Sequence, residues 1–247
     1  MKHVLSALSI VVAALAPAIA QERDPGLYRD VSLVRKLRVV CSDRHFGRVD
    51  DLIAEIPSGR ITGAVVSMVL DEGVRTVVVP YEGLEYEPRS NLLQMAACLQ
   101  DGKYPAFDAA AVKITMEPAK DGAAKQVVGH VLVSRLQSSR IDLQGGGTGW
   151  AQSATVELHS GHVAFVDVAS VKERAGDSQI HPVPWSALRW TPTTADGGGG
   201  AAMLALAKTA EQLAAAPNLI EVIVQNPLYR STVYTYFAAP RPAYDRI

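Results

Sequence analysis

The phrase VPWSALRWTP, at residues 183–192, nearly repeats the phrase VPYEGLEYEP at residues 79–88. Valine, proline, leucine and the final proline recur in place, and both aromatic positions are kept, with Trp185 matching Tyr81. The two phrases start 104 positions apart. Because ten residues can match by chance, a true duplication must also show in the flanking sequences.

The flanking sequences repeat as well. PSGRITGAVVS (57–67) corresponds to HSGHVAFVDVA (159–169) at an offset of 102, and in each a Ser-Gly turn precedes an alternating β-branched run. Two extra residues in the polar stretch VKERAGDSQ (171–179) explain the change of offset and predict a longer hairpin tip there. Repetition over about 90 residues predicts two domains of the same fold.

Each copy predicts short strands separated by turns, with one helix behind them. In the first copy, residues 45–56, 61–70 and 74–82 have strand patterns, and Gly59 marks a turn. The segments LLQMAACLQ (92–100) and AMLALAKTAEQLAAA (202–216) are predicted to be the helices. The predicted fold class is therefore mainly β with flanking helices, arranged as two tandem small β-barrels.

The first twenty residues predict an export signal and not part of the fold. Lys2 and His3 precede an apolar stretch at 4–15, and Ala-Ile-Ala at 18–20 has the pattern of a cleavage site. The apolar stretch is shorter than the roughly 20 residues that cross a bilayer, so an uncleaved anchor is the weaker alternative. We expect a periplasmic or secreted protein with no transmembrane segment after cleavage.

Length and charge set further limits. Cleavage of 20 residues from the 247 leaves 227, which suits two domains of about 100 residues. The formal net charge of −1 provides no basic surface for phosphate backbones. Nucleic-acid binding is therefore not expected.

The motifs of the first copy resemble the PRC-barrel domain, a small β-barrel found in the H subunit of photosynthetic reaction centres and in ribosome maturation factors. The resemblance rests on GRVDDL (47–52), SGRI (58–61), the following Val-Val-Ser strand and the Val-Pro-aromatic-x-x-Leu phrase. In the second copy WAQS (150–153) stands where the acidic pair would be. The resemblance implies a fold, and it implies no shared catalytic residues.

The predicted organisation has five parts. These are a signal peptide at 1–20, a PRC-barrel-like domain at 31–108, a linker at 109–126, a degenerate second PRC-barrel-like domain at 127–219 and a C-terminal hairpin extension at 220–247. The hairpin is predicted from two alternating apolar runs on either side of Asn226 and Pro227.

The repeated phrase is predicted to close each barrel. Its proline limits further strand pairing, while its first aromatic residue and its leucine fill the bottom of the core. The residues assigned to this repeat core are Val79, Pro80, Tyr81, Leu84, Val183, Pro184, Trp185 and Leu188. Superposition of the copies should also place Gly59 on Gly161.

No catalytic residue, cofactor site or metal site is predicted, and the chain is not expected to be an enzyme. His159 and His162 are the only histidines close in sequence, and no cysteine or cluster of carboxylates stands near them. Asp50 and Asp51 are adjacent in a predicted strand and so point to opposite faces, which excludes an acid-base pair. They are interpreted as solvated charges at a sheet edge.

The chain has two cysteines, Cys41 and Cys98. In an oxidising compartment such a pair is often bridged, and a bond here would join the end of the first strand to the following segment. The alternative is that both are inert, with Cys98 acting as a small buried apolar residue. The sequence leaves both possibilities open.

The expected function is that of a non-catalytic binding or assembly module in the cell envelope, with an unknown protein partner. One alternative is an accessory subunit of a membrane electron-transfer complex, by analogy with the reaction-centre subunit. The other is a metal-dependent hydrolase that uses His159 and His162. The oligomeric state is not predicted.

Overall fold

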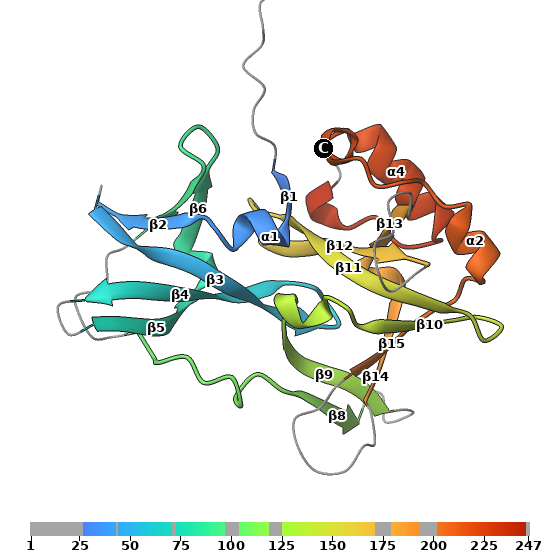
Figure 1. The fold of residues 1–247 in the computed structure, drawn as a ribbon, viewed down its shortest axis with the longest axis horizontal. Helices are drawn as coiled ribbons and strands as arrows, with labels where there is room; N and C mark the ends of the chain where they lie inside the picture. Colours follow the sequence, from blue (N-terminus) through green and yellow to red (C-terminus); the bar gives the residue numbers. More distant parts are fainter. Residues whose placement is uncertain are drawn as a thin grey trace, which may run out of the picture.

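Two β-sheets with flanking helices make up the structure, a computed structural model (Figure 1). The predicted class, mainly β with flanking helices, is confirmed. Among the residues that are described, no helix is long and apolar enough to cross a membrane. The predicted export signal lies outside them. The described residues are 27–42, 44–70, 73–96, 104–118, 125–170, 179–192 and 202–245.

The first sheet follows the order β5-β4-β3-β2-β7-β6. A short 3₁₀ helix, η1 (Tyr81–Gly83), links β5 to β6 and so connects the two ends of this path. Within the path, β2 and β7 are parallel and the other neighbours are antiparallel. The strands are β2 (Arg38–Cys41), β3 (Arg44–Ile56), β4 (Ile61–Leu70), β5 (Gly73–Pro80), β6 (Leu84–Glu87) and β7 (Leu92–Met95).

The second sheet repeats this path, strand for strand, as β13-β12-β11-β10-β15-β14. Its 3₁₀ helix η3 (Trp185–Ala187) links β13 to β14, and β10 and β15 are again parallel. Val66 pairs with Val77 in the first sheet, and Val168 with His181 in the second, so the offset changes from 102 to 104 between these strands. The strands are β10 (Arg140–Leu143), β11 (Thr148–Glu157), β12 (His162–Ala169), β13 (Ile180–Pro184), β14 (Leu188–Pro192) and β15 (Ala202–Leu206).

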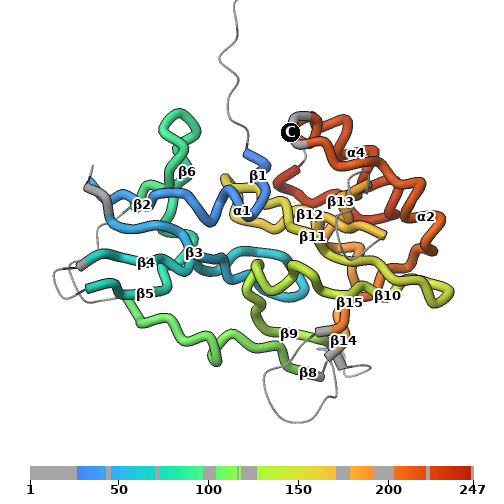
Figure 2. The backbone as a smooth tube through the Cα atoms, viewed as in Figure 1, coloured from blue at the N-terminus to red at the C-terminus, as the bar shows by residue number. Residues whose placement is uncertain are grey.

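Each sheet also receives a strand from the other half of the chain. We name β2–β7 the first unit and β10–β15 the second unit. The strand before the first unit, β1 (Tyr28–Asp30), pairs with β11, and the strand before the second unit, β9 (Lys125–Leu132), pairs with β3. Asp30 lies opposite Thr155 and Leu132 opposite Ile53, which is the same register at the offset of 102. The units have therefore exchanged their leading strands (Figure 2).

The turns of the two units contact each other reciprocally. The Ile61 amide donates to the Gly161 carbonyl at 2.8 Å, and the Val163 amide donates to the Gly59 carbonyl at 2.9 Å. Between these bonds Arg60 forms a β-bridge with His162. Since every pair is related by the offset of 102, the junction is isologous, like the interface of a two-fold symmetric dimer.

The aromatic residues of the repeated phrases lie at this junction. Trp185 packs against Gly59 and donates from Nε1 to the Pro57 carbonyl at 2.9 Å. Tyr81 packs against Gly161, and its hydroxyl donates to the Leu158 carbonyl at 2.8 Å. Both side chains are buried, yet each reaches the opposite unit. The prediction that they plug their own barrels was therefore incomplete, because a glycine without Cβ makes room for the ring on the other side.

The other residues of the repeat core have matching positions and matching burial in the two copies, with one exception. Leu84 and Leu188 follow η1 and η3 and begin β6 and β14. Pro80 is exposed, whereas its counterpart Pro184 is buried beneath the second unit's cover. The four aliphatic members Val79, Val183, Leu84 and Leu188 are buried.

Both predicted helices were wrong at their starts. Residues 92–95 form β7, because parallel pairing with β2 satisfies their backbone; residues 97–100 lie outside the described part of the chain. Residues 202–206 form β15, and the helix α2 (Ala210–Ala214) starts only after Thr209, which closes a capping box with Gln212. The apolar composition did not distinguish a buried strand from a helix.

The predicted C-terminal hairpin is also wrong. The segment is helical, with α3 (Glu221–Val224), α4 (Pro227–Tyr236) and the 3₁₀ helix η4 (Ala243–Asp245). The Asn226 side chain caps α4 by accepting from the Leu228 amide, and Pro227 occupies its first turn. The predicted linker at 109–126 contains a further strand, β8 (Ile114–Pro118), which pairs with β9.

Cys41 ends β2 and is not a free thiol. Cys98 lies outside the described residues, so the bridge between the two stays a prediction. The polar stretch at 171–178, predicted as a hairpin tip, also lies outside them.

Replacing Gly161 by alanine should destabilise the protein through the junction. An added Cβ would lie 2.5 Å from two ring carbons of Tyr81, at a φ of +65°. Gly145 is the matched control, because its φ is +83° and nothing lies within 4 Å of an added Cβ. We expect Gly145→Ala to cost about 1 kcal/mol from the backbone alone. Gly161→Ala should cost about 1–3 kcal/mol more from the ring contact, measured by urea unfolding.

Equal losses in the two variants would contradict the reciprocal junction.

Candidate functional site

The C-terminal helices cover the outer face of the second sheet. Figure 1 shows α4 and α2 beside β12 and β13. On this face the Phe165 ring lies 5.4 Å from the Tyr234 ring and 6.5 Å from the Tyr28 ring. The corresponding face of the first sheet is covered differently, by the segment that carries Phe107 and Val112. The cover is therefore where the two units differ most.

A buried ionic cluster fixes the end of the chain to this face. Asp245 accepts from the Arg230 guanidinium, from Arg241 Nε at 3.2 Å and from the Tyr28 hydroxyl at 2.7 Å. The Arg230 guanidinium also lies 4.1 Å above the centre of the Tyr28 ring and donates to two backbone carbonyls at the end of α3. These bonds hold η4 against β1 and α4.

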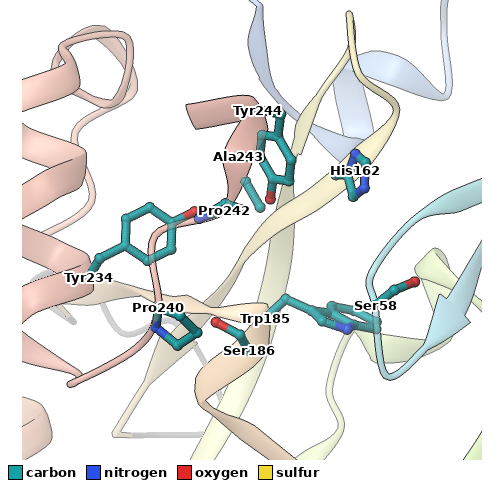
Figure 3. A pocket seen from close by; sticks show the side chains of 10 residues that line it. Ser58, His162, Trp185, Ser186, Tyr234, Pro240, Pro242, Ala243 and Tyr244 are labelled. Carbon is teal, nitrogen blue, oxygen red and sulfur yellow. The ribbon is translucent and has the colours of Figure 1, made fainter. Parts of the chain in front are cut away.

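Two cavities lie beside Tyr244, which lines both. One, which we call the junction pocket, has a volume of about 430 Å³ and is bounded by Trp185, His162, Tyr234 and the prolines at 240 and 242 (Figure 3). The other has a volume of about 490 Å³ and includes Glu157 and His159. Both volumes are within the range of about 300–1,000 Å³ typical of small-molecule sites. The junction pocket is the candidate functional site.

A chain of hydrogen bonds orients His162 at the pocket wall. The buried Glu157 carboxylate accepts from the Ser160 amide at 2.7 Å and from the Ser160 hydroxyl. His162 Nδ1 lies 3.1 Å from Ser160 Oγ. Because the serine proton is donated to Glu157, the bond requires the imidazole proton on Nδ1. In a hydrolytic triad the histidine stands between serine and carboxylate, whereas here the serine stands between them, so Ser160 is not activated.

His162 also stacks on Tyr244. The two ring centres are 4.3 Å apart, with an angle of 25° between the planes. Burial lowers the pKa of His162, although a hydrogen bond with the Ser160 backbone and the Glu157 charge oppose the change. The imidazole therefore presents a neutral, flat surface to the pocket at neutral pH.

The two histidines of the hydrolase alternative line different cavities. His159 is exposed beside the second cavity, and His162 lines the junction pocket. Within the described ranges no group of three or more His, Cys, Asp and Glu side chains could hold a metal ion.

The interpretation of Asp51 as a solvated charge is wrong. Asp51 is buried and accepts from the Leu52 amide at 2.8 Å, from the Ser134 amide at 3.1 Å and from the Ser134 hydroxyl. A register shift between Val49 and Asp51 interrupts the regular alternation of β3. Ser134 belongs to η2 (Val133–Leu136), after β9, so this carboxylate ties the first unit to the exchanged segment.

Asp167 is a second buried carboxyl group, on the covered face of β12. Its carboxyl oxygens accept from the Thr155 hydroxyl, at 3.2 and 3.1 Å. Burial raises the pKa of Asp167 well above its ordinary value of 3.8, and the negative charge of Asp30 raises it further. In the first unit the corresponding position is Val65, so the second unit carries a polar group where the first is apolar.

No family model matches the chain, and no curated protein matches its sequence. The pocket residues from the C-terminal segment, Tyr234 and Tyr244, were missed by the sequence analysis. The sequence held one signal for a helix: Arg230 and Tyr234 are four residues apart, the spacing of one helix face. The structure buries both on α4. The assumption of a hairpin hid that spacing.

Replacing Asp167 by asparagine should stabilise the protein at neutral pH. Because the pKa is raised, the folded state keeps the Asp167 proton above pH 3.8, where the unfolded state loses it. Stability therefore falls as the pH rises from 3.8 to the raised pKa of the folded state. Asparagine keeps the bond to Thr155 without the charge. The gain in the urea midpoint should be present at pH 7 and shrink as the pH falls towards 3.8.

The exposed Asp108→Asn variant is the control and should show no comparable gain. A loss of stability in Asp167→Asn at pH 7 would contradict the assignment.

Proposed function

We propose that the protein is a non-catalytic binding or assembly module made of two PRC-barrel-like units and acting in the cell envelope. The observation that carries this proposal is the reciprocal junction, which joins two copies of one strand path into a single body. The strand-for-strand repeat supports the PRC-barrel resemblance. The pattern of residues 1–20 supports a periplasmic or secreted location.

The polar groups near the junction support a non-catalytic role. Ser160 is held by Glu157, and the Ser58 hydroxyl donates to the Glu55 carboxylate at 2.6 Å. His162 Nδ1 lies 3.1 Å from Ser160 Oγ, but both serine protons go to carboxylates, so neither serine gives its proton to a histidine in the way acyl-transfer chemistry requires. The hydrolase alternative is weakened further because His159 and His162 line separate cavities.

The β4–β5 hairpin offers the protein partner an apolar surface. Val69 and Val74 lie directly opposite each other near its tip, so their side chains share one face. They are 77% and 72% exposed. Exposed apolar pairs of this kind mark contact sites more often than exposed single residues do.

A photo-crosslinking residue at Val74 tests the proposal in native cell envelopes. We expect it to capture one discrete protein, identified by mass spectrometry, because the apolar tip contacts the partner. The same residue at the exposed Asp108 should capture none. If the captured protein is a membrane electron-transfer complex, the accessory-subunit alternative replaces the general one. Absence of any specific adduct from Val74 would contradict the binding role of this hairpin.

A further inference from the structure

A basic segment lies around the start of the first unit, although the chain as a whole is close to neutral. Residues 29–48 contain five arginines, one lysine and two aspartates, a formal net charge of +4 in a chain of net charge −1. Figure 1 shows β2, which belongs to this segment, on the opposite side of the molecule from α4. The segment is therefore separate from the C-terminal helices and the two cavities beside them.

Two arginines of this segment face each other across β2 and β3. Arg38 and Arg48 are register partners in this antiparallel pair, so their side chains lie on the same face of the sheet. Both residues are exposed to solvent. Like charges directly opposite each other destabilise a sheet. Within the part of the chain that the structure describes, neither arginine forms an ion pair that would relieve this repulsion.

The neighbouring side chains on this face do not supply the missing negative charge. Ser67 lies opposite Arg48 on β4, and its hydroxyl donates to the Asp50 carboxylate. Arg35 adds a further guanidinium group, whose Nε donates to the backbone carbonyl of Asp50 at 2.5 Å. The Asp50 carboxylate thus shares this area with three arginines, Arg35, Arg38 and Arg48, and an excess of positive charge remains.

The equivalent strands of the second unit lack this arrangement. Arg140 corresponds to Arg38 at the offset of 102, and its Nε lies 2.8 Å from Asp142 Oδ1 in an ion pair. Trp150, the register partner of Arg140, corresponds to Arg48. The duplicated strand pair therefore carries one neutralised arginine in the second unit and two opposed arginines in the first. Because both units have the same strand path, the fold itself does not require the opposed pair.

We propose that Arg38 and Arg48 together bind the phosphate group of a phosphate monoester. A guanidinium group presents paired N–H donors that match the oxygens of a phosphate, and the double negative charge of a monoester compensates both arginines. Direct register partners have Cβ atoms about 5 Å apart, so both side chains can reach one phosphate. This site goes beyond the proposed partner contact at Val74 and does not depend on it.

Inorganic phosphate is the first probe. Its binding to the whole protein is followed by NMR shifts of the arginine Nε–H signals at low ionic strength, where screening is weakest. We expect saturable binding, which Arg38→Gln and Arg48→Gln each weaken about tenfold through the loss of charged hydrogen bonds. Arg38→Lys keeps the charge but loses the paired donors, so it should also weaken the binding.

A matched control and a stability measurement separate binding from folding. Arg140→Gln changes the equivalent strand, where Asp142 already neutralises the arginine, and it should leave the phosphate affinity unchanged. Without phosphate, Arg38→Gln should have a urea midpoint equal to or above that of the parent, because one of two opposed charges is removed. Phosphate should raise the midpoint of the parent and of Arg140→Gln more than that of Arg38→Gln.

Vesicles distinguish a lipid headgroup from a soluble phosphate compound. Phosphatidic acid carries a phosphate monoester, so co-sedimentation with phosphatidylcholine vesicles only when they contain it would identify a lipid as the source. Binding of inorganic phosphate without co-sedimentation would identify a soluble compound. The proposal is overturned if the parent protein does not bind phosphate saturably. It is equally overturned if Arg38→Lys binds as tightly as the parent, or if Arg140→Gln weakens binding as much as Arg38→Gln.

Discussion

The fit of an aromatic ring over a glycine that lacks Cβ holds the two halves of this protein together. It occurs twice, with Trp185 over Gly59 and Tyr81 over Gly161, and hydrogen bonds between the turns accompany it. A side chain at either glycine would separate ring from turn, and both positions also have positive φ. The exchanged strands β1 and β9 depend on the same relative placement of the units. Cooperative unfolding of both units as one body follows from this arrangement.

Around this symmetric centre the two units have diverged. Asp51 of the first unit accepts hydrogen bonds from Ser134, which follows β9. The equivalent position of the second unit is Ser153, which has no carboxylate to make the reciprocal bond. The outer face carries Val65 in the first unit and Asp167 in the second. Accordingly one face has a simple apolar cover, and the other has helices, an ionic cluster and two cavities. Divergence between the units has thus produced the covered face beside which both described cavities lie.

Much of the fold could be predicted because a duplication leaves matched phrases at constant offsets. The positions of β3, β4, Gly59 and the repeated phrase all followed from it. The exchange of leading strands could not be predicted, because the apolar residues of β1 or β9 would be buried equally well against the sheet of either copy. The segment at 92–95 has a composition that suits helix or strand, and its parallel neighbour decided the outcome. The site was missed since Tyr234 and Tyr244 become neighbours of Trp185 only through tertiary packing.

The strand exchange also governs the order in which the chain can acquire its structure during synthesis. β1 leaves the ribosome early, but its partner β11 is made more than a hundred residues later. Until then the main-chain groups of β1 face water or a chaperone, and β3 likewise waits for β9. A ribosome that pauses midway therefore presents an N-terminal half with an open sheet edge, the kind of surface that pairs wrongly with other chains. Only the arrival of the second copy closes the first.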